Sequence, residues 1–289
     1  MATIREYRKK IKSTKNIAKI TKAMQMVAAS KMRRSQDQAQ KSRPYAEGLV
    51  NLTSLISTQA DPSIHPLLLA KNEDSVKELV ILVAPEKGLC GSLITNLAKS
   101  FYQSFLVNKN LEFIIVGKKA RTIVEKVNGD IIAEFNTGSL QPKYEIVPAI
   151  ARLAEEKFLS GDVGKVRIIF SEFVNTMTQK PTQKILLPLH LTSEEKVNPE
   201  NNLNPFYLFE PSAKDITDSL LELYLEIEIY QFLLESYASE QSARMVAMKN
   251  ATDNAISLTN ALTLEFNKAR QANITSEISD IGNSQMAVQ

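Results

Sequence analysis

The chain has 289 residues, of which 44% are hydrophobic and 23% are charged, close to the averages of globular proteins. This composition excludes a chain that is disordered throughout and a fibrous repeat. The most apolar stretch, residues 220–234, is interrupted by Glu222, Glu226 and Glu228, which excludes a membrane-spanning helix there. The formal net charge is only +3, but residues 1–43 contain thirteen Lys or Arg and two acidic residues. This basic N-terminal arm is expected to meet a negatively charged partner.

The first expected element is a long N-terminal helix. Residues 1–43 contain neither Gly nor Pro, the two residues that most disfavour a helix interior. The helix is expected to continue through Pro44, with a kink, to about Ser57. Four of its residues form an apolar stripe that is expected to pack on a second helix: Ile17, Ile20, Met24 and Val27.

The middle of the chain alternates short β-branched runs with helical patterns. Strands are expected at residues 78–84, 111–117, 130–135 and 165–170, with a further one at 184–189. Helices are expected between them at residues 92–107, 118–127 and 144–159. This alternation predicts a small, mostly parallel α/β sheet.

A second long helix is expected after residue 211, because no Gly or Pro follows until Gly282, which is expected to end it. From Leu223 to Leu262, residues at alternating spacings of four and three are apolar at ten of twelve positions, which is typical of a coiled-coil seam. The predicted fold is therefore mixed: a long antiparallel coiled coil of the N- and C-terminal helices with an inserted small α/β (Rossmann-like) domain. The expected domains are residues 1–57, 75–205 and 212–289.

The lengths of the two helices predict their register. If both meet the inserted domain at the same height, Thr3 lies beside Phe266, since both helices rise equally per residue. Residues 267–281 then have no partner helix and project alone. A lone helix of that length is marginal in water, so it needs a surrounding protein to hold its shape.

Little in the sequence indicates catalysis. Residues 85–92 lie between an expected strand and helix, where an α/β fold can hold a phosphate, but they lack both the P-loop ending and the third glycine of a dinucleotide-binding motif. We interpret them as a structural turn, with Cys90 as a small packed thiol. Four acidic residues alternate with the seam and are expected on a solvated helix face: Glu222, Glu226, Glu228 and Glu235. We expect no enzyme activity, no metal site and no cofactor.

The basic arm has three interpretations besides a merely solvated helix face. It could bind nucleic acid, although its only aromatic residues before position 60 are Tyr7 and Tyr45. It could be a cleaved transit peptide, although lysines outnumber arginines. It could instead face an acidic protein partner. The residues alone leave these alternatives open.

Four segments carry a resemblance to a known family: residues 20–32 (ITKAMQMVAASKM), 87–91 (KGLCG), 242–255 (SARMVAMKNATDNA) and 262–281 (LTLEFNKARQANITSEISDI). In this order they resemble the gamma subunits of F-type ATP synthases. The resemblance implies a non-catalytic central rotor shaft, whose partners are the ring of alpha and beta subunits, the epsilon subunit and the c-ring, with no nucleic acid. It also implies that proton flow turns the shaft, which drives three catalytic sites through different affinities.

The resemblance also implies individual roles. The N-terminal motif and its neighbours are implied to contact acidic segments of the beta subunits through Met24, Lys31, Arg33 and Arg34. The C-terminal motif is implied to contact beta-subunit loops through Lys268, Arg270 and Gln271. Residues 206–211 (FYLFEP) are implied to face the c-ring and the epsilon subunit through Tyr207 and Glu210.

One cysteine, no evident insertion and no transit segment lead us to expect a bacterial-type chain, peripheral on the cytoplasmic side of the inner membrane. Two alternatives remain from other functional classes. One is an α/β phosphate- or nucleotide-binding protein with a coiled-coil arm, and the other is a coiled-coil protein that binds nucleic acid.

Overall fold

The structure, a computed structural model, describes residues 3–59, 66–68, 77–107, 110–138, 141–189 and 213–286. The chain divides into two compact units, which we call the helical unit (residues 1–29 and 244–289) and the sheet unit (residues 30–243). Both units contain parts of the two long helices, α1 (Ile4–Gln59) and α5 (Ala213–Met286). Helix α1 passes through Pro44 and ends two residues beyond the predicted position.

The sheet unit contains one five-stranded sheet. Its strands are β1 (Lys77–Val83), β2 (Leu111–Val116), β3 (Asp130–Phe135), β4 (Val163–Phe173) and β5 (Gln179–Leu187). Their order is β3-β2-β1-β4-β5, in which β1 pairs in parallel with β2 and β4, β2 pairs in parallel with β3, and β4 pairs antiparallel with β5. The predicted strands and the mostly parallel sheet are confirmed, and β5 begins five residues earlier than expected.

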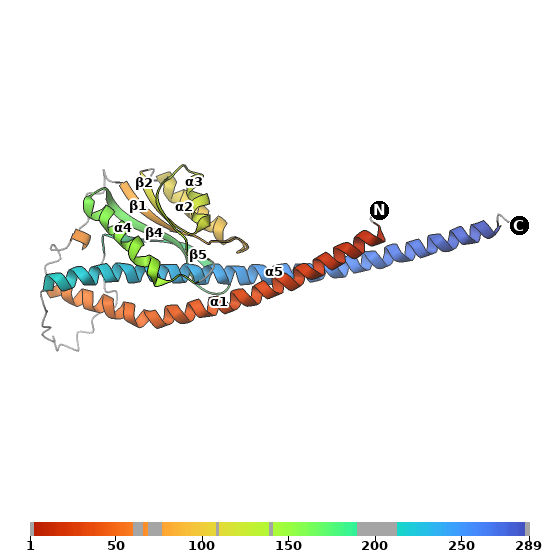
Figure 1. Cartoon of the computed structure of the whole chain (residues 1–289), viewed down its shortest axis with the longest axis horizontal. Coiled ribbons are helices and arrows are strands. Elements are labelled where there is room, and N and C mark those ends of the chain that lie inside the picture. The colour runs from red at the N-terminus through yellow and green to blue at the C-terminus, as the bar shows by residue number, and fades with distance from the viewer. Residues whose placement is uncertain are drawn as a thin grey trace. The chain divides into compact units, whose positions relative to one another are not determined.

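Helices cover both faces of this sheet (Figure 1). On one side lie α2 (Leu93–Val107) and α3 (Lys118–Glu125), and on the other α4 (Val147–Ser160) and part of α5. A short 3₁₀ helix, η3 (Tyr144–Ile146), precedes α4, and another, η2 (Pro66–Leu68), precedes β1. The three predicted helices between the strands are thus confirmed.

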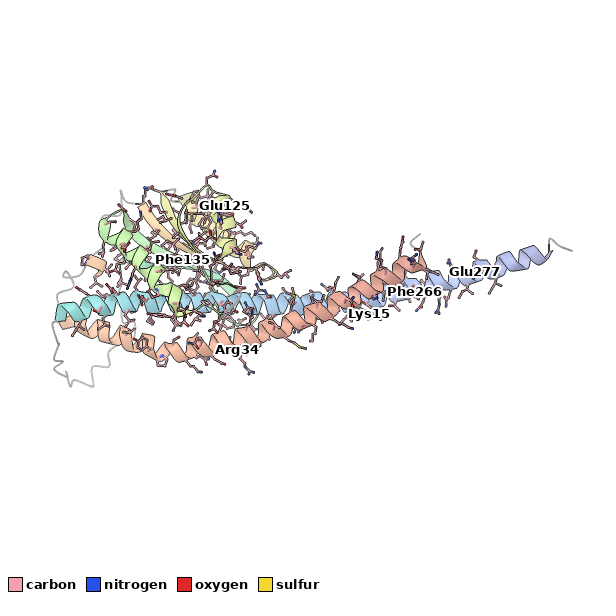
Figure 2. The ribbon with its side chains drawn as sticks, viewed as in Figure 1. Lys15, Arg34, Glu125, Phe135, Phe266 and Glu277 are labelled. Carbon is pink, nitrogen blue, oxygen red and sulfur yellow. The ribbon has the colours of Figure 1, made fainter. Side chains whose placement is uncertain are left out.

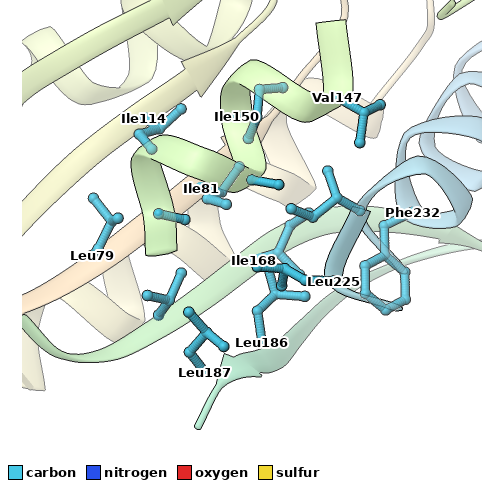
Figure 3. Close-up of a cluster of buried hydrophobic side chains, with 14 of the residues drawn as sticks. Leu79, Ile81, Ile114, Val147, Ile150, Ile168, Leu186, Leu187, Leu225 and Phe232 are labelled. Carbon is cyan, nitrogen blue, oxygen red and sulfur yellow. The ribbon is translucent and has the colours of Figure 1, made fainter. Parts of the chain in front are cut away.

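Alternating residues along the strands build two separate cores, because successive side chains of a strand point to opposite faces. One core joins Ile81 and Ile168 of the sheet to Ile150 of α4 and to Leu225 and Phe232 of α5 (Figure 3). Phe232 stacks on Phe170 of β4, with ring centroids 4.7 Å apart. This packing attaches α5 firmly to the sheet.

The opposite core joins Val80, Leu82 and Phe113 of the sheet to Phe101 of α2 and Val124 of α3. Each of these side chains is at least 98% buried. Burying a large apolar side chain contributes about 1.5–3 kcal/mol, so the two cores together give the sheet unit a stable framework.

The helical unit consists of the beginning of α1 and the end of α5, which run antiparallel side by side (Figure 1). The predicted fold class, an antiparallel pair of terminal helices with an inserted α/β domain, is confirmed. The predicted helix end at Gly282 is wrong, because α5 continues to Met286. A single glycine costs only about 1 kcal/mol in a helix interior, which the rest of the helix can offset. The predicted domain boundaries at residues 57, 75, 205 and 212 stay predictions.

Candidate functional site

Small side chains form the seam between the two helices of the helical unit. In the described part of this unit the buried residues are Thr14 and Ala28 on α1 and Met248, Thr252, Ala255 and Thr259 on α5, of which only Met248 is large. Each buried threonine hydroxyl donates a hydrogen bond to a carbonyl one turn earlier in its own helix. Thr252 donates to Met248 at 2.8 Å, Thr14 donates to Lys10, and Thr259 donates to Ala255. Small residues let the two helix backbones approach closely at these positions, and Met248 is the one larger side chain buried among them in the described part of the unit.

The apolar stripe predicted to form this seam lies elsewhere. Ile17, Ile20 and Val27 are 49%, 59% and 56% exposed, and Met24 is only half-buried. On α5, Leu258 was expected in the seam and is 52% exposed, whereas its neighbour Thr259 is buried. On α5 the predicted seam is confirmed at Met248 and Ala255, which are buried, and is wrong at Leu258. On α1 it is wrong at Ile17, Ile20 and Val27, because the heptad that packs there carries Thr14 and Ala28.

Exposed apolar residues therefore cover the outside of the helical unit. Five further large side chains that sequence reasoning did not single out are also about half exposed or more: Met26, Ile256, Leu264, Ile274 and Ile278. The small residues at the packing positions of α1 could have revealed this surface, because a helix that buries Thr14 and Ala28 presents its larger residues outward. Exposed apolar surface on this scale is typical of a protein–protein interface.

Positive charge lies among these apolar side chains. The helical unit holds twelve Lys or Arg and five acidic residues, a net charge of +7. Arg8, Lys12, Lys15 and Lys19 of α1 line a groove of about 610 Å³ together with residues of α5 that include Ile256. Figure 2 labels Lys15 on this surface. The combination predicts a partner surface that is apolar with acidic groups.

The register of the two helices differs from the predicted one. The Arg8 guanidinium lies over the Phe266 ring, 5.8 Å from its centroid, where Thr3 was expected (Figure 2 labels Phe266). Pairing thus extends further along α5. Among the residues of α5 whose burial the structure describes, Ala269 is the last with a partly buried side chain, and residues 270–279 are exposed. The single projecting helix begins near residue 270 rather than at 267.

The implied partner-contact residues fall into both units. Met24, Lys268, Arg270 and Gln271 belong to the helical unit, where the last three are exposed and Lys268 pairs with Glu265 at 3.4 Å. In the sheet unit, Lys31 is half-buried and Arg33 and Arg34 are exposed. The structure brings Lys31 and Arg34 to one pocket, but Arg33 does not line it. Tyr207 and Glu210 lie outside the described residues.

The turn after β1 joins loops of the sheet unit to one another. The Pro85 carbonyl accepts a hydrogen bond from the Lys119 amide at the start of α3, and the Glu86 carboxylate accepts one from the Thr137 amide. A Cβ atom at Gly117, where φ is +90°, would lie 2.1 Å from the Ala84 carbonyl oxygen, so only glycine allows this approach. These contacts support the interpretation of residues 85–92 as a structural turn.

Cys90 is 1% exposed and packs against Leu93 of α2 and Ala243 of α5, which confirms the prediction of a packed thiol. The neighbouring Leu89 has a positive φ of 64° and is 63% exposed.

The acidic face predicted for α5 is only partly solvated. Glu222 is exposed, but Glu226, Glu228 and Glu235 are partly buried, because α5 packs on the sheet as well as on α1. Burial raises the pKa of Glu228 to about 7, against the opposing effects of Lys184 and of a hydrogen bond with Tyr224. These residues serve the packing of α5, and the prediction of a uniformly solvated face was wrong.

Comparisons with known proteins agree on one family. A sequence profile described as "ATP synthase" matches residues 3–288. The ATP synthase gamma chain of Methylacidiphilum infernorum is 42% identical over 298 residues and is covered completely, as is this chain. The chain belongs to the ATP synthase gamma-chain family. The gamma chain of Glaesserella parasuis is also 42% identical, with 97% of this chain and 98% of the relative covered.

A solved structure gives the fold of this family in an assembly. A chain of the Euglena gracilis mitochondrial ATP synthase, in a structure described as OSCP/F1/c-ring in rotational state 3, matches with a TM-score of 0.67 at 20% identity. The match covers 99% of this chain and 94% of that one. The two proteins share a fold.

In the described part of this gamma-family chain, no helix is both long and apolar enough to cross a bilayer.

Proposed function

We propose that this chain is the central rotor shaft of an F-type ATP synthase, coupling rotation of a membrane c-ring to ATP synthesis or hydrolysis in a ring of alpha and beta subunits. Its family membership supports this function, and so does the description of similar structures as a rotor and as a central stalk with a c-ring. An epsilon subunit completes the proposed set of partners, and nucleic acid is not among them.

One observation carries the proposal: in the described part of the helical unit the buried residues are small except Met248, while many large apolar residues are exposed. A coiled coil that works alone buries its largest apolar residues, because their transfer from water drives the pairing. Ile17, Ile20 and Val27 are exposed instead. A shaft that turns inside a protein ring needs such a surface, since the ring then supplies the apolar contacts without locking the shaft by interdigitated side chains.

The coupling follows from differential binding. A shaft with unequal faces stabilises a different conformation at each of three catalytic sites, and by thermodynamic reciprocity nucleotide binding at those sites pushes the shaft toward particular orientations. The chain itself needs no catalytic group for this role. We therefore propose that it is a non-catalytic subunit, held peripherally at the cytoplasmic side of a bacterial inner membrane through its complex.

Specific residues are proposed for each partner. Met24, Lys31, Arg33 and Arg34 contact acidic segments of the beta subunits, where exposed cations support such a role. Lys268, Arg270 and Gln271 contact beta-subunit loops, and Tyr207 and Glu210 contact the c-ring and the epsilon subunit. In domain terms, residues 1–57 and 212–289 form the shaft and residues 75–205 the foot.

Reconstitution with alpha and beta subunits tests the function. The isolated chain is expected to show no ATPase activity, whereas the mixture is expected to gain a cooperative one. The variant combining Ile17→Ser, Ile20→Ser and Val27→Ser is expected to assemble poorly, while the free energy of unfolding of the isolated chain changes by less than about 0.5 kcal/mol per substitution, as is usual at exposed positions. Leu106→Ser, at a 74% exposed residue of the sheet unit, is the matched control and is expected to assemble normally.

Normal assembly and coupled activity of the triple variant would contradict the proposal. So would unfolding of the isolated chain carrying the three substitutions, because that result would place the three side chains in the interior.

A further inference from the structure

A pocket of about 460 Å³ lies in the sheet unit between α1, α5 and the segment that leads into η3. Lys31 and Arg34 line it from α1, Lys143 and Tyr144 from the segment before α4, and Tyr230 and Tyr237 from α5. Its volume lies within the range of pockets that bind small molecules. The proposed rotor function assigns Lys31 and Arg34 to contacts with beta subunits, but it assigns this pocket no small molecule.

The charge of the pocket is one-sided. Its lining contains three cationic side chains and no carboxylate. Arg34 has no ion pair with any residue that the structure describes, and Figure 2 labels this side chain on α1. Lys143 reaches Glu145 at 3.6 Å, but both side chains are at least two-thirds exposed, so this ion pair contributes little. Two cations from different segments are therefore available for an anionic ligand.

Aromatic side chains form the rest of the lining. The Tyr144 and Tyr230 rings meet edge to face, with centroids 5.6 Å apart and planes at 90°. The Tyr144 hydroxyl donates to the Glu226 carboxylate, which fixes the ring. Tyr237 is 7% exposed and is held by its burial. Fixed aromatic rings bind a planar group at low entropic cost.

We propose that this pocket binds a small molecule that carries a phosphate group beside a planar ring, a ligand of the size and chemistry of a nucleoside diphosphate. The guanidinium of Arg34 and the ammonium of Lys143 bind the phosphate oxygens, because charge-assisted hydrogen bonds are the strongest available there. The tyrosines contact the planar ring. The inference does not rest on the rotor function, since the pocket is formed by this chain alone.

Calorimetric titration of the purified full chain tests the proposal with three probes: ADP, inorganic pyrophosphate and adenosine. ADP is expected to bind most tightly, since only ADP offers both chemical groups. Arg34→Gln and Lys143→Gln are each expected to weaken ADP binding by about tenfold or more. Lys41→Gln is the matched control, because Lys41 is an exposed cation seven residues from Arg34 on α1, outside the pocket, and this variant is expected to bind ADP normally.

The aromatic part of the site has its own variants. Tyr144→Leu is expected to remove the preference for ADP over pyrophosphate, whereas Tyr144→Phe keeps the ring and is expected to retain it. Circular dichroism verifies that each variant is folded.

Several results would overturn the proposal. They are the absence of ADP binding at about 1 mM, equal loss in Lys41→Gln and Arg34→Gln, or pyrophosphate binding as tightly as ADP. A hexaglutamate peptide that binds where ADP does not would also overturn it and would assign the pocket to an acidic protein segment. None of these results bears on assembly with alpha and beta subunits, so the rotor function is tested separately.

Discussion

The hydroxyl oxygens of Thr21 on α1 and Thr252 on α5 lie 2.7 Å apart. This hydrogen bond joins residues 231 positions apart in the chain and sits in the seam of the helical unit. Two threonines can meet this closely only where the helix backbones approach each other more closely than leucine side chains would allow. The pair thus fixes both the register and the spacing of the two helices.

Engineered disulfides test this register. Thr21→Cys combined with Thr252→Cys is expected to form a disulfide efficiently, since their hydroxyl positions are already close and a disulfide needs Cβ atoms about 3.8 Å apart. Thr3→Cys combined with Phe266→Cys is expected to bridge poorly, because Arg8 lies at Phe266 instead. Non-reducing electrophoresis measures both. Equal bridging of the two pairs would show that the helices slide past each other.

Overpacking tests the spacing. Thr252→Leu adds volume to a 6% exposed seam position and is expected to destabilise the helical unit by about 1–3 kcal/mol. Ile256→Leu, four residues away at a 51% exposed position, is expected to stay within about 0.5 kcal/mol of the unsubstituted chain. Urea unfolding followed by circular dichroism compares the two. A neutral Thr252→Leu would mean that the seam is loosely packed.

Glu228 predicts a pH dependence of the stability of the sheet unit. The pKa of this carboxyl is raised to about 7 by burial, so the folded chain holds the proton more tightly than the unfolded chain does. The free energy of unfolding is therefore expected to fall as the pH rises from about 4.5 to about 7, by no more than about 3 kcal/mol from this group. Below that window the carboxyl is protonated in both states and causes no loss of stability, and above it the loss of free energy of unfolding is constant.

The substitution Glu228→Gln is expected to remove this pH-dependent fall in the free energy of unfolding. The variant is therefore expected to gain stability relative to the unsubstituted chain between pH 5 and pH 8. Glu222→Gln, at an exposed position of the same helix, is the control and is expected to keep the original pH dependence. Urea unfolding at the two pH values measures both variants. The same pH dependence in Glu228→Gln as in the unsubstituted chain would show that the carboxyl is hydrated.

Truncation tests the projecting end of α5. Deleting residues 283–289 is expected to leave coupled activity nearly unchanged, whereas ending the chain after Arg270 removes the exposed single helix and is expected to impair coupling. The sheet unit should stay folded in both, because neither cut reaches its residues. ATP-driven proton pumping in reconstituted vesicles and circular dichroism give the two measurements. Full pumping by the shorter chain would show that the contacts made by the projecting helix are dispensable.

The strands and helices of the sheet unit could be predicted from the sequence because local patterns determine them. The run ELVILV in β1 has β-branched residues at a length that suits a buried strand, and the breaker-free ends indicate long helices. Gly282 misled the prediction, since a cost of about 1 kcal/mol does not stop a helix that is otherwise favourable.

The surface of the helical unit could not be predicted in the same way. Apolar periodicity shows which side chains avoid water, but it does not show whether they do so inside the chain or against another protein. Ile20 and Thr21 are neighbours in sequence, and only the phase of the whole helix decides which one meets α5. Local sequence patterns also could not predict the pocket lined by Tyr144 and Tyr230, because these two residues are 86 positions apart in the chain.

The burial of Cys90 has a practical consequence for observing rotation. The only thiol of the chain is 1% exposed beneath Leu93 and Ala243, so thiol-reactive dyes and bead linkers have almost no native site to attack. A cysteine introduced on an exposed part of the sheet unit, such as Leu106→Cys, would then be labelled selectively without removing the native residue. A single-molecule experiment would therefore need only this one added cysteine as the attachment point, and the buried Cys90 would keep its native packing.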